Sequence, residues 1–159
     1  MSNASNLVLR PIARIAVAIG WMGLIFLVSA RSTVPQPPGL GPVVTSNLGH
    51  FSVYFVLAIL VWWVLGGFGL EGRRRWLLAI ALAVLYGVSD EWHQSFVSGR
   101  QPDPLDVIVD AVGAACGLAT ISWTVRRMRS TDEGTDEPEP APTAGESRRR
   151  NSPGIADTT

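Results

Sequence analysis

Four long apolar segments, separated by short polar connectors, occupy most of the chain up to residue 125. A helix that crosses a membrane needs about 20 mostly apolar residues, and each segment is close to or above that length. The four segments are Ile12–Ala30, Leu48–Leu70, Trp76–Val97 and Leu105–Val125. The third is continuously apolar only as far as Val88, and most of its later residues are polar. This pattern predicts an all-α, polytopic membrane protein whose core is a four-transmembrane-helix bundle.

By composition, the chain divides into an N-terminal stretch of residues 1–11, a membrane domain of residues 12–125 and a tail of residues 126–159. The tail is rich in Pro, Glu, Asp, Thr and Arg and has almost no large apolar side chain. Such a sequence cannot bury enough apolar surface to offset the entropy that ordering costs. We therefore predict a disordered C-terminal tail.

The first apolar segment has a second interpretation, as a cleaved signal peptide. Arg10 and Arg14 precede the apolar run, and residues 28–30 (Val-Ser-Ala) resemble a small-residue cleavage site. The run is near full spanning length, which favours a retained helix.

Arginines flank the predicted helices unevenly, and cytoplasmic loops of membrane proteins carry an excess of basic residues. The connectors at residues 31–47 and 98–104 hold one arginine each. The opposite helix ends hold eight, namely Arg10, Arg14, Arg73, Arg74, Arg75, Arg126, Arg127 and Arg129. This distribution predicts a multi-pass protein of the cell membrane with both termini cytoplasmic and with the first and third connectors outside.

With this orientation, the polar side chains of the membrane domain gather near its outer end. His50 lies at the outer start of the second helix. Asp90 lies roughly 21 Å along the third helix at 1.5 Å per residue, in the outer third of an apolar core about 30 Å thick. The fourth helix enters from outside with Asp106 and, one turn deeper, Asp110. The expected ligand-binding set is His50, Asp90, Glu91, His93, Gln94, Arg100, Asp103, Asp106 and Asp110.

An ionisable side chain inside a membrane is costly and is a functional candidate by default. For any one of these residues taken alone, a structural role is favoured over a functional one. The number of such groups at one end favours a functional site.

Small residues repeat at helical spacing on the third and fourth helices. A Gly-x-x-x-Gly stripe joins Gly113 to Gly117, and a stripe of small residues on the third helix ends at Gly87. Small residues let helix backbones approach closely. We expect the third and fourth helices to pack along these stripes, with Asp90 or Glu91 opposite the carboxylates of the fourth helix.

Composition disfavours several other classes of function. The formal net charge is zero, and the basic residues line helix ends without interleaved aromatic residues, so we predict no nucleic-acid partner. The single cysteine, Cys116, excludes an intramolecular disulfide and a Cys-based metal site. A metal site built from His50, His93, Asp90 and Asp106 matches no established ligand spacing. We therefore predict no metal and no cofactor.

Three short stretches carry a family resemblance when they are read together. Residues 47–51 read Asn-Leu-Gly-His-Phe and lead into a helix that contains Tyr54. Residues 86–96 read Tyr-Gly-Val-Ser-Asp-Glu-Trp-His-Gln-Ser-Phe. The third stretch is Gly99-Arg100, then residues 103–106 (Asp-Pro-Leu-Asp), and then Asp110 and Gly113. Over about Leu48–Gly117 the chain resembles the VanZ-like family of bacterial and archaeal membrane proteins, and the middle stretch is the specific one.

Three positions depart from the pattern of that family. Asn47 stands where Lys is common, Ser98 stands where Pro precedes the Gly-Arg pair, and Asp110 stands where Asn is usual. The first removes a possible cation and the third adds a possible negative charge. The departures leave the family resemblance intact but bring into question the net charge that the family would lead us to expect at the site.

The resemblance implies a four-helix membrane protein of a prokaryotic cell envelope. The founding member is associated with low-level resistance to teicoplanin, a glycopeptide antibiotic that binds cell-wall precursors at the outer face. The resemblance therefore suggests a role in antibiotic resistance. Many relatives lie outside resistance clusters, so membership alone does not imply resistance.

Three functions fit these residues to different degrees. The favoured one is non-catalytic: the outer cluster binds a membrane lipid headgroup, a cell-wall precursor or an envelope protein, with Arg100 contacting a phosphate or carboxylate. The second is a membrane-embedded hydrolase or transferase acting on a lipid-linked substrate. The third, an ion pathway, is disfavoured because the inner parts of the helices lack ionisable groups to continue a relay.

The enzyme hypothesis assigns its roles to four candidate catalytic residues. His93 or His50 would be the general base, and Asp90 or Glu91 would orient that base or act as an acid. The sequence contains neither a nucleophile elbow nor a His-Glu-x-x-His zinc pair. The sequence thus leaves catalysis open and favours binding.

Overall fold

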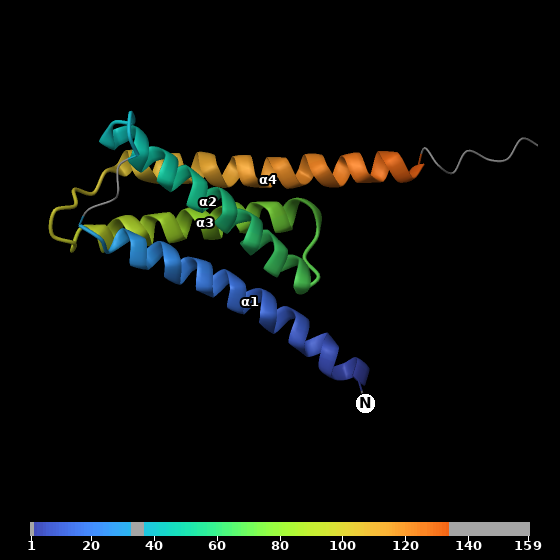
Figure 1. Cartoon of the computed structure of the whole chain (residues 1–159). Coiled ribbons are helices and arrows are strands. Elements are labelled where there is room, and N and C mark those ends of the chain that lie inside the picture. The colour runs from blue at the N-terminus through green and yellow to red at the C-terminus, as the bar shows by residue number, and fades with distance from the viewer. Residues whose placement is uncertain (1, 33–36, 134–159) are drawn as a thin grey trace, which may run out of the picture. The chain divides into compact units, whose positions relative to one another are not determined.

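The computed structural model describes residues 2–32 and 37–133 of the chain. Its helices, in chain order, are α1 (Ser2–Ser29), α2 (Pro42–Gly67), α3 (Gly72–Gln94) and α4 (Pro104–Glu133) (Figure 1). No strand occurs within those two ranges. The all-α class predicted from the apolar segments is confirmed.

The chain divides into two compact units, residues 1–124 and residues 125–159. The first unit holds α1, α2, α3 and most of α4. In the second unit, residues 125–133 are the last turns of α4. The remainder of the predicted disordered tail lies outside the described residues.

The fourth helix extends past Val125, where we expected it to end. The hydroxyl groups of Ser130 and Thr131 donate to the backbone carbonyl of Arg127 at 2.9 and 3.0 Å. Extending an existing helix adds one hydrogen bond for each residue fixed, so propagation costs far less than nucleation. Residues 126–133, assigned to the tail from composition, are therefore helical.

Within the described residues, three helices are long and apolar enough to cross a membrane, at Pro11–Ser29, Pro42–Gly67 and Pro104–Met128. The chain is therefore a helical membrane protein. Helix α3 is not among the three, because the arginines at its start and the acidic pair Asp90 and Glu91 near its end shorten its apolar run.

Helix α2 lies at the centre of the first unit and packs against both α1 and α3. It begins at Pro42, six residues before the expected start, because proline is favoured in the first turn of a helix. The core combines buried side chains from all the helices. They are Ile25, Tyr54, Leu57, Ala58, Ala79, Ala83, Ala114 and Leu118. Many large apolar side chains remain exposed, such as Leu85 at 64%, which suits a surface surrounded by lipid.

Helix α4 packs against the backbone of α2 through its glycine stripe. A Cβ atom added to Gly113 would lie 2.4 Å from the carbonyl oxygen of Phe51, and one added to Gly117 would lie 2.4 Å from that of Phe55. The expectation that this stripe faces the third helix was wrong. Helical spacing identifies the face of a helix that carries small residues, but it does not identify the helix that packs against that face.

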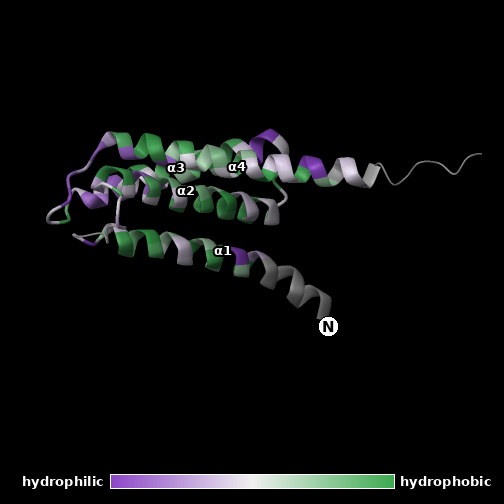
Figure 2. Cartoon of the chain, turned by 45° about the horizontal axis from the view of Figure 1, so that its top comes forward, coloured by the Kyte–Doolittle hydropathy of each residue, from purple (hydrophilic) through white to green (hydrophobic). Residues whose placement is uncertain are grey.

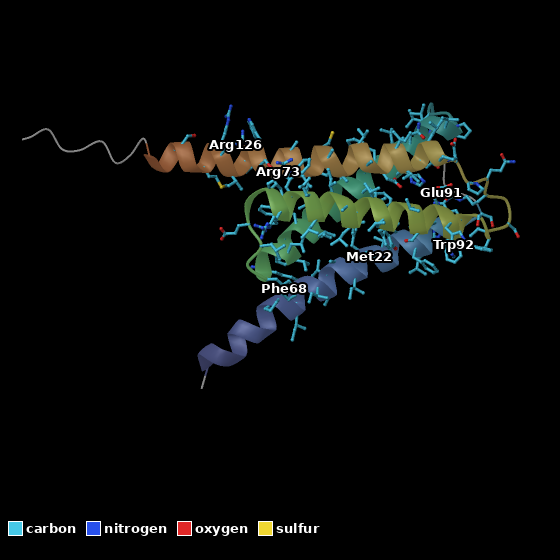
Figure 3. All side chains as sticks on the ribbon, turned by 180° about the vertical axis from the view of Figure 1, so that it is seen from behind. Met22, Phe68, Arg73, Glu91, Trp92 and Arg126 are labelled. Atoms are coloured by element: carbon cyan, nitrogen blue, oxygen red, sulfur yellow. The ribbon has the colours of Figure 1, made fainter. Side chains whose placement is uncertain are left out.

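The connections alternate between the two ends of the first unit. The α1–α2 and α3–α4 connections lie at one end and the α2–α3 connection at the other (Figure 1). We call the end that holds the α3–α4 connection, residues 95–103, the site end. The connection is coloured hydrophilic along most of its length, and further hydrophilic patches lie on the helices, which are otherwise largely hydrophobic or pale (Figure 2). Glu91 and Trp92 lie near the site end, and Phe68 and Arg73 lie at the opposite end (Figure 3).

At that opposite end, two arginines hold the C-terminal turns of α2. Arg14 donates to the carbonyl oxygen of Trp63 at 3.3 Å, and Arg75 donates to that of Trp62 at 2.7 Å. The Arg75 guanidinium also lies 3.2 Å from the centroid of the Trp62 ring. Positive charge at a helix C-terminus is stabilised by the helix dipole. Burial, together with the charge of Arg14, lowers the pKa of Arg75.

Candidate functional site

His50 lies between two carboxylates of α4. Its Nδ1 atom is 2.9 Å from Asp110 Oδ1, and its Nε2 atom is 3.6 Å from Asp106 Oδ2. Residues four apart share one face of a helix, so α4 presents both carboxylates to the same ring. The first distance is a hydrogen bond and the second is slightly longer than one. Asp110, only 1% exposed, therefore fixes the orientation of the imidazole.

Glycines make room for this arrangement. A Cβ atom at Gly87 of α3 would lie 2.9 Å from Asp110 Oδ2, and Gly113 lets α4 approach the turn of α2 that carries His50. A buried polar group needs a hydrogen-bond partner within the protein, because bulk water does not reach it. The small residues that the sequence showed at helical spacing thus permit the close approach of His50 and Asp110.

Asp90 of α3 is buried at 4% exposure and is hydrogen-bonded through one oxygen. Its Oδ2 atom accepts from Ser29 Oγ at 2.8 Å and from Gln94 Nε2 at 3.1 Å. The Ser29 bond joins α1 to α3. The other oxygen, Oδ1, is buried and has no hydrogen-bond partner within the described part of the chain. Asp90 therefore keeps an unused acceptor inside the protein.

A first cavity of about 90 Å³ lies among α1, α2 and α3 at the site end. Its polar lining consists of Ser29, Thr45, Ser46, His50, Asp90 and Arg100. Arg100 Nε donates to the carbonyl oxygen of Arg31 at 3.1 Å, which uses one of the five N–H groups of the guanidinium. The structure thus brings three hydroxyl side chains, a histidine, a cation and a carboxylate to one small space.

Glu91 and Asp103 hold the start of α4. A carboxylate oxygen of Glu91 accepts the backbone N–H of Asp103, and Asp103 Oδ1 accepts the backbone N–H of Leu105 at 2.9 Å. Asp103 is thereby the N-cap of α4, with Pro104 in the first helical position as is typical. Of the expected site residues, these two have structural partners at the α3–α4 connection, and neither is among the residues that line the first cavity.

His93 lies away from His50 and lines a second cavity, of about 340 Å³. Its ring stacks on Phe26 of α1 with 4.1 Å between centroids. The lining residues are Phe26, Tyr86, Ser89, Asp90, Trp92, His93 and Phe96. The two histidines that we expected in one cluster therefore line different cavities, and Asp90 lines both. Sequence spacing placed Asp90 and His93 on neighbouring turns, but it contained no information about Phe26.

No group of three or more His, Cys, Asp or Glu side chains has a metal-binding arrangement in the described ranges. The combination considered from the sequence included both histidines, and the structure places them in different cavities.

Two residues that the sequence did not mark as site residues belong to this region. Ser29, which we had read only as part of a cleavage-like motif, donates to Asp90. Tyr54 is fully buried, its ring is parallel to that of His50 at 6.4 Å, and its hydroxyl has no hydrogen-bond partner in the described structure. The spacing of four residues between His50 and Tyr54 was the available signal, since it places both on one helix face.

Apolar helices that enclose a histidine–carboxylate cluster define a helical membrane protein with a polar site among its helices. The family model described as VanZ/LLP1 matches residues 3–125, so the chain belongs to the VanZ-like family, as its motifs indicated. The uncharacterised protein C11E3.10 of Schizosaccharomyces pombe is 32% identical over 85 residues, which cover 53% of this chain and 49% of that protein. The chain thus spans about half the length of this curated relative.

The fungal relative has a consequence for the expected source of the chain. Because similarity extends to a eukaryote, family membership does not by itself identify a prokaryotic protein. No solved structure matches the chain.

Proposed function

We propose that the chain is a cell-envelope membrane protein that binds a small polar headgroup in the first cavity. The headgroup belongs to a membrane lipid or a lipid-linked cell-wall precursor, and binding alters susceptibility to glycopeptide antibiotics of the teicoplanin type. The observation that carries the proposal is the position of Arg100 beside three hydroxyl side chains at the site end. A guanidinium recognises phosphate and carboxylate through two parallel hydrogen bonds.

The size of the cavity limits what can bind there. The first cavity has a volume of about 90 Å³. A space of that size can take a small polar group but is far too small for a glycopeptide antibiotic. An effect on susceptibility would therefore act through the lipid or precursor, not through capture of the drug.

The charges around the cavity narrow the ligand further. Asp90 lines the cavity together with Arg100, and Asp106 and Asp110 lie next to His50. Like charges repel strongly where the dielectric constant is low. A ligand with one anionic group beside neutral hydroxyl groups fits this balance better than a polyanion.

The binding test uses phosphatidylglycerol, whose headgroup combines one phosphate with hydroxyl groups and has no amine. Native mass spectrometry of the full chain in detergent would measure how much of this lipid remains bound. Arg100→Ala should weaken binding about tenfold, because a charge-assisted hydrogen bond contributes roughly 1.5–3 kcal/mol. Arg73→Ala is the matched control, since Arg73 is exposed at the opposite end. Equal binding by the two variants would refute the site.

A cellular measurement accompanies the binding test. A bacterial host that expresses the chain should show a changed inhibitory concentration of teicoplanin, and Arg100→Ala should abolish the change. If the change in inhibitory concentration persists in Arg100→Ala, with the protein present at wild-type level, the effect on susceptibility does not depend on headgroup binding at Arg100.

We further propose that α3 is a fourth span and that both termini are cytoplasmic. The α2–α3 and α3–α4 connections lie at opposite ends (Figure 1), so if α2 and α4 cross the bilayer, the helix that joins them crosses it too. The arginine distribution then places the site end outside.

Cysteine accessibility tests this orientation. In a Cys116→Ser background, single cysteines at Thr45 and Ser98 should react with a membrane-impermeant reagent in intact cells. A cysteine at Gly72 should react only after the cells are opened. The reverse labelling pattern would place the site end in the cytoplasm.

The geometry of His50 supports a second candidate function, hydrolysis or group transfer on a lipid-linked substrate. A histidine held by a carboxylate is the usual arrangement of a general base, and Asp110 holds His50 in that way. Asp110→Asn removes the charge beside His50 but keeps a side chain of the same size in place, so the position of His50 is preserved. Under this hypothesis, the variant abolishes turnover of a lipid-linked substrate but leaves phosphatidylglycerol bound. If the purified wild-type chain leaves such a substrate unchanged, the binding function stands alone.

A further inference from the structure

The second cavity combines aromatic rings with a buried carboxylate. Phe26 comes from α1, Tyr86 and Trp92 come from α3, and Phe96 comes from the α3–α4 connection. Trp92 and Phe96 meet edge to face, with 5.4 Å between ring centroids. The faces of aromatic rings attract cations, and several rings around one space form the usual binding site for an organic ammonium group. The rings alone thus favour a cationic ligand.

The polar atoms of the same cavity are hydrogen-bond acceptors that the protein leaves free. Asp90 Oδ1 and His93 Nε2 are buried and have no hydrogen-bond partner within the described residues. Ser89 Oγ donates its own proton to the carbonyl oxygen of Tyr86 at 2.7 Å, which leaves its lone pairs available. Neutral histidine accepts through Nε2 when its proton is on Nδ1. With His93 in that tautomer, the residues that line the second cavity supply three acceptors, one of them the Asp90 carboxylate.

We propose that the second cavity binds a primary alkylammonium group, of the kind present in an ethanolamine headgroup. An –NH₃⁺ group has three donors and no acceptor, which matches the three free acceptors of Ser89, Asp90 and His93. Its positive charge is balanced by Asp90. A quaternary ammonium such as choline has no N–H group and would leave all three acceptors unpaired, so this site discriminates between the two.

The rim of the cavity favours a lipid as the source of the amine. Trp92 and Phe96 are 69% and 70% exposed, and Trp92 lies near the site end (Figure 3). Tryptophan is typical of the level at which lipid headgroups meet the apolar core. This position makes the second cavity accessible to a headgroup without passage through the bilayer core. The site is separate from the first cavity, although the two share Asp90.

The experiment compares two lipids with identical acyl chains, phosphatidylethanolamine and phosphatidylcholine. Native mass spectrometry of the full chain in detergent gives the affinity for each. The wild-type chain should bind the ethanolamine lipid at least about tenfold more tightly, because choline cannot donate the charge-assisted hydrogen bonds that an –NH₃⁺ group makes. Equal affinity for the two lipids would overturn the proposal.

Variants test whether the second cavity causes the preference. Asp90→Asn should remove it, whereas Glu71→Gln should keep it as the matched control, since Glu71 is exposed in the α2–α3 connection. Asp90 also bonds Ser29 and Gln94, so Trp92→Leu provides a second test at an exposed ring that leaves those bonds in place. A preference that survives in both Asp90→Asn and Trp92→Leu would refute the site.

Soluble glycerophosphoethanolamine identifies the source of the amine. If it competes with the ethanolamine lipid at comparable concentration, the ammonium site stands and a soluble amine is its ligand. If it does not compete, the lipid is the ligand. Failure of the phosphatidylglycerol test at Arg100 leaves this result unaffected, so the two proposals fail separately.

Discussion

Replacing Gly113 with alanine should force α2 and α4 apart and disturb the site. The new Cβ atom would lie 2.4 Å from the carbonyl oxygen of Phe51, and ordinary contact begins at 3.4 Å, so the backbones must separate by about 1 Å. Phe51 follows His50 directly, and Gly113 lies one turn below Asp110. The same movement would lengthen the His50–Asp110 hydrogen bond from 2.9 Å to about 3.9 Å, beyond the range of a hydrogen bond.

The magnitude follows from two opposing effects. Overpacking a well-packed interface costs about 1–3 kcal/mol, and alanine in a helix is favoured over glycine by roughly 0.5–1 kcal/mol. We expect Gly113→Ala to lower the free energy of unfolding by about 1–2 kcal/mol. Gly20→Ala, on α1 with no atom within 4 Å of the new Cβ, should instead raise it by about 0.5–1 kcal/mol.

The assay is reversible unfolding of the full chain in mixed detergent micelles, followed by circular dichroism. Gly117→Ala controls for general destabilisation, because its Cβ would meet the carbonyl oxygen of Phe55 at the same 2.4 Å but one turn farther from Asp110. Both variants should lose stability, and only Gly113→Ala should also lose phosphatidylglycerol. The packing argument is wrong if Gly113→Ala is as stable as Gly20→Ala.

Three further variants probe other contacts in the same unfolding assay. Tyr86→Phe removes the 2.6 Å hydrogen bond to the carbonyl oxygen of Met22 and should cost about 0.5–1.5 kcal/mol; no loss would show that water replaces it. Arg75→Ala removes the charge over the Trp62 ring and should cost about 1 kcal/mol, a loss that Arg75→Lys should only partly restore. Asp103→Ala removes the N-cap of α4 and should cost about 1 kcal/mol, whereas Asp103→Asn should be nearly neutral.

The sequence predicted the features that depend on one helix at a time. The lengths of the apolar segments predicted the number of helices, and the spacing of Asp106 and Asp110 predicted that both lie on one face of α4. We expected Asp90 or Glu91 of α3 opposite them, whereas the structure places His50 of α2 between the two carboxylates. The predicted neighbour of the glycine stripe at Gly113 was wrong, because the spacing of residues within one helix does not indicate which helix packs against it. For the same reason, Ser29 and Phe26 were missed: their roles depend on how α1 lies against α3.

The unsatisfied polar atoms of this protein support the proposed ligand sites. Four side-chain atoms are buried without a hydrogen-bond partner in the described structure, on Tyr54, Asp90, Glu91 and His93. Such an atom costs about 1–3 kcal/mol, and native proteins contain few of them. A purely structural role for Asp90 would pair both of its oxygens, yet Ser29 and Gln94 donate to the same one. The unpaired atoms of Asp90 and His93 belong to residues that line one cavity, where a ligand with several donors would satisfy them together.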